Sequence, residues 1–102
     1  MKRRMIRYIV KPDRAAENET LIAQVFEQLH LERPAGFGYA AFKLDDGVSF
    51  VHLVSFEAED NGKALGNLPA HKAFRAGISD RCESRPVTVD LNEIGSYAFF
   101  SE

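Results

Sequence analysis

Tryptophan is absent from this chain of 102 residues, and cysteine occurs only once, at Cys82. A disulfide needs two cysteines, so none can form within the chain. No apolar stretch near its start resembles a signal peptide, and none is long enough to cross a membrane. We therefore expect a reducing, cytoplasmic environment and no membrane partner.

A strong charge of either sign is also missing. Lys and Arg together number 13 and Asp and Glu 15, which gives a formal net charge of −2. The one basic cluster, at positions 2–4, lies at a chain end and is typical of a solvated tail. Nucleic acids attract proteins through larger basic patches, so no nucleic-acid partner is expected.

Sequence signatures of metal and cofactor sites are lacking as well. The three histidines, His30, His52 and His71, come from three separate segments. No His-Xaa-His, His-Xaa₃-His or paired-cysteine spacing occurs, and there is no glycine-rich phosphate loop. We expect neither a metal nor a cofactor.

Bulky core material is present in quantity, because the chain contains eight phenylalanines and three tyrosines. A chain of this length buries enough apolar surface to fold without disulfides or metals. No internal repeat or linker interrupts it, so residues 1–102 are predicted to form a single domain.

The hydrophobic pattern predicts four strands and two helices. Runs of β-branched and aromatic residues favour strands over 5–10, 37–44, 48–56 and 87–94. Apolar residues spaced by three and four predict amphipathic helices over 14–32 and 69–81. The sequence Asp-Asp-Gly at 45–47 predicts a tight turn that makes the two middle strands antiparallel. The polar segment 57–67 is predicted to be a loop with at most one helical turn.

This order of elements defines an α+β fold of the ferredoxin-like βαββαβ type, with both helices on one face of an antiparallel sheet. Both faces of the third strand are largely apolar: Phe50, His52, Val54 and Phe56 alternate with Val51 and Leu53. The two helices can cover only one face, so a second copy is expected to cover the other and form a homodimer. The aromatic tail at 97–100 adds to this surface, and Val54 is expected in the sealed interface.

Three segments resemble the antibiotic biosynthesis monooxygenase-like family of the dimeric α+β barrel superfamily. They are Val-Lys-Pro-Asp at 10–13, Val-Ser-Phe-Glu at 54–57 and Leu-Pro-Ala-His-Lys-Ala-Phe at 68–74. The resemblance spans nearly the whole chain and implies a dimeric barrel of ferredoxin-like subunits. Proteins of this kind include cofactor-independent oxygenases of quinols and aromatic polyketides, haem-degrading enzymes and members without an assigned activity.

The chain departs from the catalytic branches that this resemblance implies. Ile6 and Tyr8 stand on the first strand where an asparagine is typical, and the typical tryptophan is missing. The haem-ligating histidine of the family would fall near 75–78, where this chain has none. Haem binding is therefore not expected, whereas quinol oxygenation stays open.

His71 is the first candidate for a catalytic residue, because it lies in the first turn of the second helix on the side that packs onto the sheet. It could accept a proton from a bound phenol or hydroquinone, and Tyr8 could orient that substrate. The alternative is a half-buried histidine that donates to a backbone carbonyl. The other expected pocket residues are Ile6, Asn18, His52 and Phe74, and His52 could equally be a satisfied histidine in the core or at the dimer interface.

Three functions of different classes therefore remain open. The first is a cofactor-free monooxygenase acting on a quinol-like or aromatic small molecule. The second is a non-catalytic small-molecule binding or stress-related protein, and the third is a structural dimer that contacts another protein. A deep pocket between helices and sheet would favour the first two, and a filled core the third.

Overall fold

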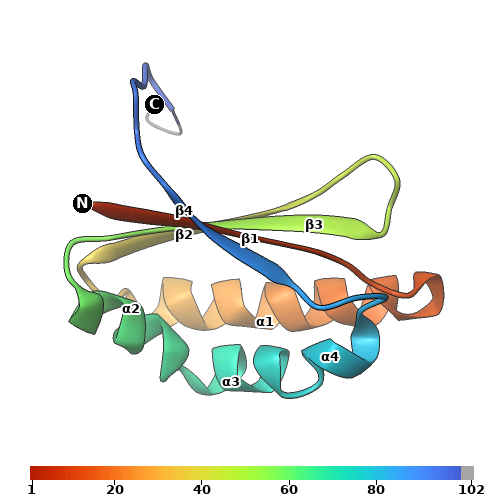
Figure 1. The fold of residues 1–102 in the computed structure, drawn as a ribbon. Coiled ribbons are helices and arrows are strands. Elements are labelled where there is room, and N and C mark those ends of the chain that lie inside the picture. The colour runs from red at the N-terminus through yellow and green to blue at the C-terminus, as the bar shows by residue number, and fades with distance from the viewer. Residues whose placement is uncertain (100–102) are drawn as a thin grey trace.

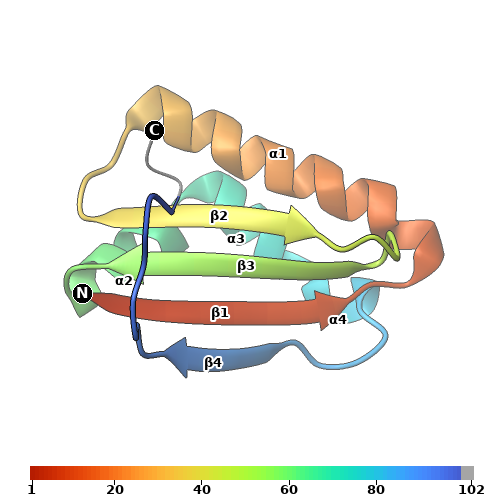
Figure 2. The same cartoon turned by 90° about the horizontal axis from the view of Figure 1, so that it is seen from above.

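The structure, a computed structural model, describes residues 1–99. Four strands form one antiparallel sheet in the order β2-β3-β1-β4, and all helices lie on one of its faces (Figure 1, Figure 2). This arrangement confirms the predicted ferredoxin-like α+β fold. The elements are β1 (Lys2–Ile9), a 3₁₀ turn (Pro12–Arg14), α1 (Ala15–Glu32), β2 (Phe37–Lys43), β3 (Ser49–Phe56), α2 (Glu59–Gly66), α3 (Pro69–Ala76), α4 (Ile78–Arg81) and β4 (Val87–Leu91).

The predicted tight turn joins β2 to β3. The Asp46 carboxylate accepts hydrogen bonds from the backbone N–H groups of Val48 and Ser49, and Gly47 adopts a φ of 79°. Glycine adopts such a backbone conformation without strain, which explains its place in the turn. The turn fixes the register in which His52 on β3 lies between Ala41 on β2 and Ile6 on β1.

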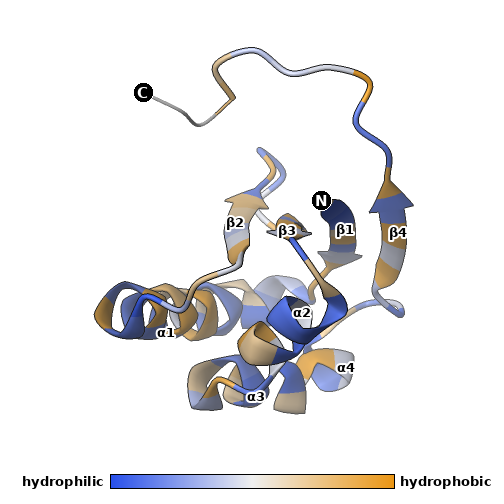
Figure 3. Ribbon diagram, turned by 90° about the vertical axis from the view of Figure 1, so that its left-hand side faces the viewer, coloured by the Kyte–Doolittle hydropathy of each residue, from blue (hydrophilic) through white to orange (hydrophobic). Residues whose placement is uncertain are grey.

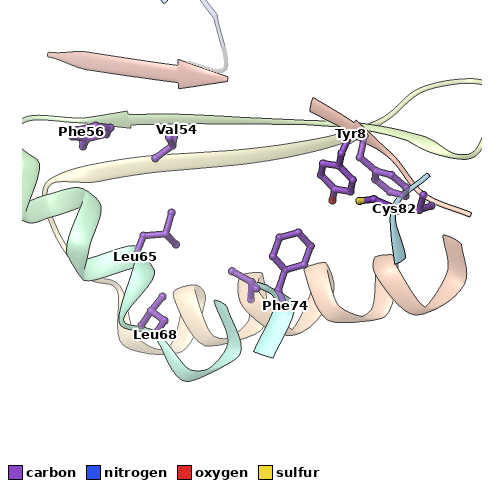
Figure 4. Close-up of a cluster of buried hydrophobic side chains, with 10 residues drawn as sticks. Tyr8, Val54, Phe56, Leu65, Leu68, Phe74 and Cys82 are labelled. Atoms are coloured by element: carbon purple, nitrogen blue, oxygen red, sulfur yellow. The ribbon is translucent and has the colours of Figure 1, made fainter. Parts of the chain in front are cut away.

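This register decides which face of β3 meets the helices. Phe50, His52, Val54 and Phe56 are all buried, whereas Val51 and Leu53 on the opposite face are half-buried. Figure 4 shows Val54 and Tyr8 pointing from the sheet toward the helical layer, with Leu65 and Phe74 pointing back at them. The expectation that Val54 lies in an interface between two copies is therefore wrong, because its side chain belongs to the helix-covered core.

Helix α2 corrects the prediction of a loop over 57–67. Two glycines lower its helix propensity, but the Asn61 side chain accepts a hydrogen bond from the Ala58 backbone N–H at 2.9 Å, and Leu65 is buried. Gly36 makes room for this contact: a Cβ added there would lie 2.1 Å from Asn61 Nδ2. These tertiary contacts outweigh the weak local preference.

The predicted helix over 69–81 is divided at Gly77 into α3 and α4. The division turns the Arg81 side chain inward, where it donates to the Phe74 carbonyl oxygen at 2.6 Å. A Cβ at Gly77 would lie 3.2 Å from an Arg81 guanidinium nitrogen, so the glycine also leaves space for that group. The break thus positions a buried cation that a continuous helix would carry elsewhere.

The sheet face opposite the helices carries exposed apolar side chains. Strand β4 is shorter than the predicted 87–94, and its Val87, Val89 and Leu91 lie on this open face. The chain after β4 passes above the sheet (Figure 2, Figure 3), and its Ile94 and Tyr97 are almost fully exposed. Phe100 of the aromatic tail lies outside the described residues. Within residues 1–99, no helix has the length and apolar character needed to cross a membrane.

Candidate functional site

A cleft of about 630 Å³ lies between the sheet and the helices α2 and α3. Apolar side chains of both layers line it, among them Val54 and Phe56 of β3 and Leu65 of α2. Five of the six residues expected at a site also line the cleft: Ile6, Tyr8, His52, His71 and Phe74. The sixth, Asn18, is fully buried behind Tyr8 and is not part of the lining.

Two tyrosine hydroxyls flank the His52 ring at the inner end of the cleft. The Tyr8 hydroxyl lies 2.8 Å from His52 Nε2, and the Tyr39 hydroxyl lies 2.6 Å from Nδ1. Side chains alternate along a strand, so β1, β3 and β2 each present one of these three residues to the helix-covered face. Both imidazole nitrogens therefore have a partner, which agrees with the expectation of a satisfied buried histidine.

Asn18 and Arg81 extend this group of hydrogen bonds toward α4. Asn18 Nδ2 donates to the Tyr8 hydroxyl at 3.0 Å, and Asn18 Oδ1 accepts from Arg81 Nε at 3.0 Å. The Arg81 guanidinium also lies over the Phe74 ring, 5.2 Å from its centroid. Its side chain is buried, and within residues 1–99 no carboxylate forms an ion pair with it. We call the residues Arg81, Asn18, Tyr8, His52 and Tyr39 the polar chain.

His71 lies in the first turn of α3 and lines the cleft next to the polar chain. Its ring contacts the Tyr39 ring edge-on, with centroids 6.1 Å apart, and lies 6.0 Å from the Phe74 ring centroid. Nδ1 is buried and has no hydrogen-bond partner in the part of the chain that the structure describes. The alternative in which Nδ1 donates to a backbone carbonyl thus has no support in this structure.

The side chains of His52, His71, Tyr8 and Tyr39 are uncharged at neutral pH, and burial favours this state further. Burial lowers the pKa of His52 to about 4, with a smaller contribution from the charge of the nearby His71. It also lowers the pKa of His71 to about 4, assisted by the positive charge of Arg75. Burial raises the pKa of Tyr8 and of Tyr39 above the usual value. The inner end of the cleft therefore offers neutral hydrogen-bond donors and acceptors.

Charged residues surround the outer part of the cleft. Arg4 pairs with Asp90 at 3.0 Å, and Glu59 pairs with Lys2 at 2.5 Å. Arg75 donates to the Gly66 carbonyl oxygen at 2.7 Å. No carboxylate of residues 1–99 lies within ion-pair distance of Arg75. As for metal ligands, no group of three or more His, Cys, Asp or Glu side chains in that range is placed to hold an ion.

Arg81 is not among the residues predicted at a site, and the sequence pattern allows Tyr39 either to line a pocket or to serve ordinary packing. Tyr39 lies on an edge strand, where the pattern fits ordinary packing equally well. An arginine near a helix end is usually solvated, so only the glycine four residues earlier in the chain could have indicated that Arg81 turns inward.

No protein-family profile and no curated protein matches the sequence. Solved structures do match, and they define the fold as that of the antibiotic biosynthesis monooxygenase-like proteins, which confirms the expected resemblance at the level of fold. A crystal structure of an antibiotic biosynthesis monooxygenase superposes with a TM-score of 0.78 at 14% identity, covering 93% of this chain and 100% of its own.

Two further matches come from named organisms. Rv0793 from Mycobacterium tuberculosis has a TM-score of 0.76 at 14% identity, covering 93% of this chain and 96% of its own. A variant of SnoaB, a cofactor-independent oxygenase from Streptomyces nogalater, has a TM-score of 0.69 at 14% identity, covering 93% of this chain and 94% of its own. These TM-scores establish the shared fold, whereas identities this low leave the activity to be argued from the site.

Proposed function

We propose that the protein is a cofactor-independent monooxygenase that acts on a quinol-like or hydroxylated aromatic molecule bound in the cleft. The observation that carries this proposal is the placement of neutral His71 against the Tyr39 ring, in an apolar cleft that Tyr8 and His52 also line. A cleft of about 630 Å³ is in the range of small-molecule sites. The activity in the name of SnoaB is of the same kind.

In the proposed reaction, His71 accepts a proton from a phenolic hydroxyl of the substrate. The resulting phenolate is electron-rich enough to transfer electrons to O₂. One oxygen atom forms a new bond to a ring carbon, and the other leaves as water after taking up two protons. For a hydroquinone the products are a hydroxyquinone and water, and the substrate itself supplies all the electrons. Tyr8 orients the substrate indirectly, through its hydrogen bond to His52 in the polar chain. Ile6 and Phe74 contact the substrate ring.

Oxygen uptake with a panel of hydroquinones and anthrones tests this proposal. We expect turnover above the uncatalysed background, and loss of a general base in His71→Ala should lower the rate about 10²- to 10⁴-fold. His30→Ala, which removes an exposed histidine at the end of α1, is the matched control. Absence of turnover for the whole panel, or full activity in His71→Ala, would refute the mechanism.

The pKa of His71 favours a second candidate, a binding protein without catalysis. A base with a pKa of about 4 accepts a proton from a phenol only weakly at pH 7. In that case the same cleft binds a small aromatic molecule and releases it unchanged. Saturable binding of a hydroquinone under anaerobic conditions, with no oxygen uptake in air, would favour this function. The third candidate, a structural dimer that only contacts another protein, gives no role to the cleft.

We also propose that the protein is a homodimer formed through the open sheet face. The support is the exposed apolar surface of Val87, Val89 and Leu91, together with the exposed Ile94 and Tyr97 in the segment after β4, which passes above the sheet (Figure 2). A monomer rarely exposes an apolar area of this kind, and a second copy covers it by the same contact in both directions. The cytoplasmic location expected from the single cysteine stays a prediction.

A further inference from the structure

Each hydrogen bond of the polar chain has a donor and an acceptor, and Arg81 determines which residue is which. A guanidinium group has only donors, so Asn18 must present its carbonyl oxygen to Arg81 Nε, 3.0 Å away. The Asn18 amide is thereby fixed, because turning it over would place two donors against each other. Its Nδ2 group then donates to the Tyr8 hydroxyl oxygen at 3.0 Å.

This hydrogen bond from Asn18 determines where the Tyr8 hydroxyl proton lies. A phenol hydroxyl has one proton and prefers to hold it in the plane of its ring, where Asn18 already occupies one direction. The Tyr8 proton is thus left for His52 Nε2, 2.8 Å away. Neutral imidazole has one donor and one acceptor nitrogen, so Nδ1 must carry the ring proton. It donates to the Tyr39 hydroxyl oxygen at 2.6 Å.

The Tyr39 hydroxyl carries the last donor proton of the polar chain. Its oxygen accepts from His52, and no second hydrogen-bond partner for the hydroxyl is found within the described range. Tyr39 lines the cleft, so a ligand in the cleft can approach this proton. The series of hydrogen bonds that begins with Arg81 as a donor therefore ends with the Tyr39 hydroxyl as a donor in the cleft.

We propose that Tyr39 is the specificity-determining residue of the cleft, where it donates a hydrogen bond to a carbonyl or phenol oxygen of an aromatic ligand, and that Arg81 is a positioning residue that acts through His52. This deepens the proposed function and rests on it for the choice of ligand. Aromatic compounds with an acceptor oxygen bind in preference to hydrocarbons of the same shape. The acceptor end of the ligand lies at Tyr39, next to His71.

The tautomer of His52 tests the direction of the chain without any ligand. Long-range nitrogen-15 correlation spectra of the imidazole rings at pH 7 distinguish a protonated Nδ1 from a protonated Nε2. Loss of one ring's signals in His30→Gln and in His71→Gln assigns the three histidines. We expect His52 to be protonated at Nδ1. Protonation at Nε2 would overturn the proposal.

Arg81→Gln tests the role of the positioning residue, because a glutamine amide can donate or accept and no longer fixes Asn18. We expect the Nε2-protonated form of His52 to appear in this variant, and an unchanged pure Nδ1 form would overturn the role given to Arg81. The spectrum of the unmodified protein decides the proposal even if this variant does not fold, because protonation of His52 at Nε2 would contradict the order of donors that begins at Arg81.

Binding of 1-tetralone and tetralin tests the recognition by Tyr39. The two compounds share a ring system, and only 1-tetralone has an acceptor oxygen. We expect Tyr39→Phe to weaken the binding of 1-tetralone about 3- to 10-fold and to leave that of tetralin unchanged. Equal effects on both compounds, or no measurable binding of either, would overturn the recognition. If the unmodified protein binds 1-tetralone in preference to tetralin but takes up no oxygen with the hydroquinones and anthrones, only the proposed monooxygenase activity would be refuted.

Discussion

The hydroxyl of Tyr8 on β1 lies 2.8 Å from Nε2 of His52 on β3, although the residue directly opposite Tyr8 is Phe50. The contact is therefore diagonal across two paired strands, within reach of an aromatic side chain. Both side chains are at least 95% buried. The inner end of the cleft is thus held by the sheet itself, so that its polar groups are fixed before any ligand binds.

Asn18 should contribute strongly to stability. In Asn18→Ala, the buried Arg81 guanidinium loses the acceptor of its Nε group, and the Tyr8 hydroxyl loses a donor. We expect the free energy of unfolding to fall by about 2–3 kcal/mol, because an unsatisfied buried donor on a charged group is costly. Urea denaturation measures the loss. Thr20→Ala, an exposed substitution on the same helix, should change it by less than about 0.5 kcal/mol.

The depressed histidine pKa values predict a loss of stability in acid. The folded protein holds His52 with a pKa of about 4, whereas the usual value of 6.5 applies when the chain unfolds. The unfolded state therefore binds more protons below pH 6.5, and the stabilising effect of the neutral ring is lost as the pH falls from 6.5 toward 4.

We expect the protonation of His52 to lower the free energy of unfolding by about 3 kcal/mol between pH 6.5 and pH 4, and that of the more exposed His71 to lower it by less. Urea denaturation at a series of pH values measures the profile, which should flatten in His52→Gln. His30→Gln controls for histidine removal. An unchanged profile in His52→Gln would contradict the assigned pKa.

Gly36 should be required for the position of α2, which forms one wall of the cleft. It has a φ of 91°, and a side chain there would collide with Asn61. We expect Gly36→Ala to lower the unfolding free energy by about 1–3 kcal/mol, because strain and lost capping add together. Gly38→Ala is the matched control, since nothing lies within 4 Å of its added Cβ. Thermal unfolding that is equally affected in both variants would argue against the Asn61 contact.

The proposed homodimer predicts a different response on each face of the protein. Leu53 lies half-buried on the open sheet face, so Leu53→Glu should produce a monomer in light scattering at micromolar concentration, because an unpaired charge in an apolar interface is unfavourable. Leu31 is 79% exposed near the end of α1, and Leu31→Glu should leave the dimer intact. A monomeric unmodified protein would contradict the proposed dimer.

The predicted order of elements and the hairpin agree with the structure because both depend on local patterns. The turn needs only Asp46 and Gly47, which lie next to each other in the sequence. Helix α2 could not be predicted, since it depends on Asn61 fitting against Gly36, 25 positions earlier in the chain. Such a contact between distant segments leaves no periodic signal.

The candidate site was predictable in part for the same reason. Strand alternation places Ile6, Tyr8 and His52 on one sheet face, and the helical pattern places His71 and Phe74 above them. The pattern does not indicate that Asn18 is buried behind Tyr8, because its role comes from Arg81 on a helix 63 residues away. Polar networks of this kind follow from packing that the sequence pattern does not describe.

The central claim is that the cleft between the sheet and the helices α2 and α3 binds aromatic molecules that carry a hydroxyl group. Chemical-shift mapping of the isotope-labelled protein during titration with 1-naphthol tests it most directly. We predict saturable shifts at Tyr39, Leu65, His71 and Phe74, and none at Val51 or Val89 on the open sheet face. Shifts confined to the open face, or no saturable shift at the cleft, would contradict the account.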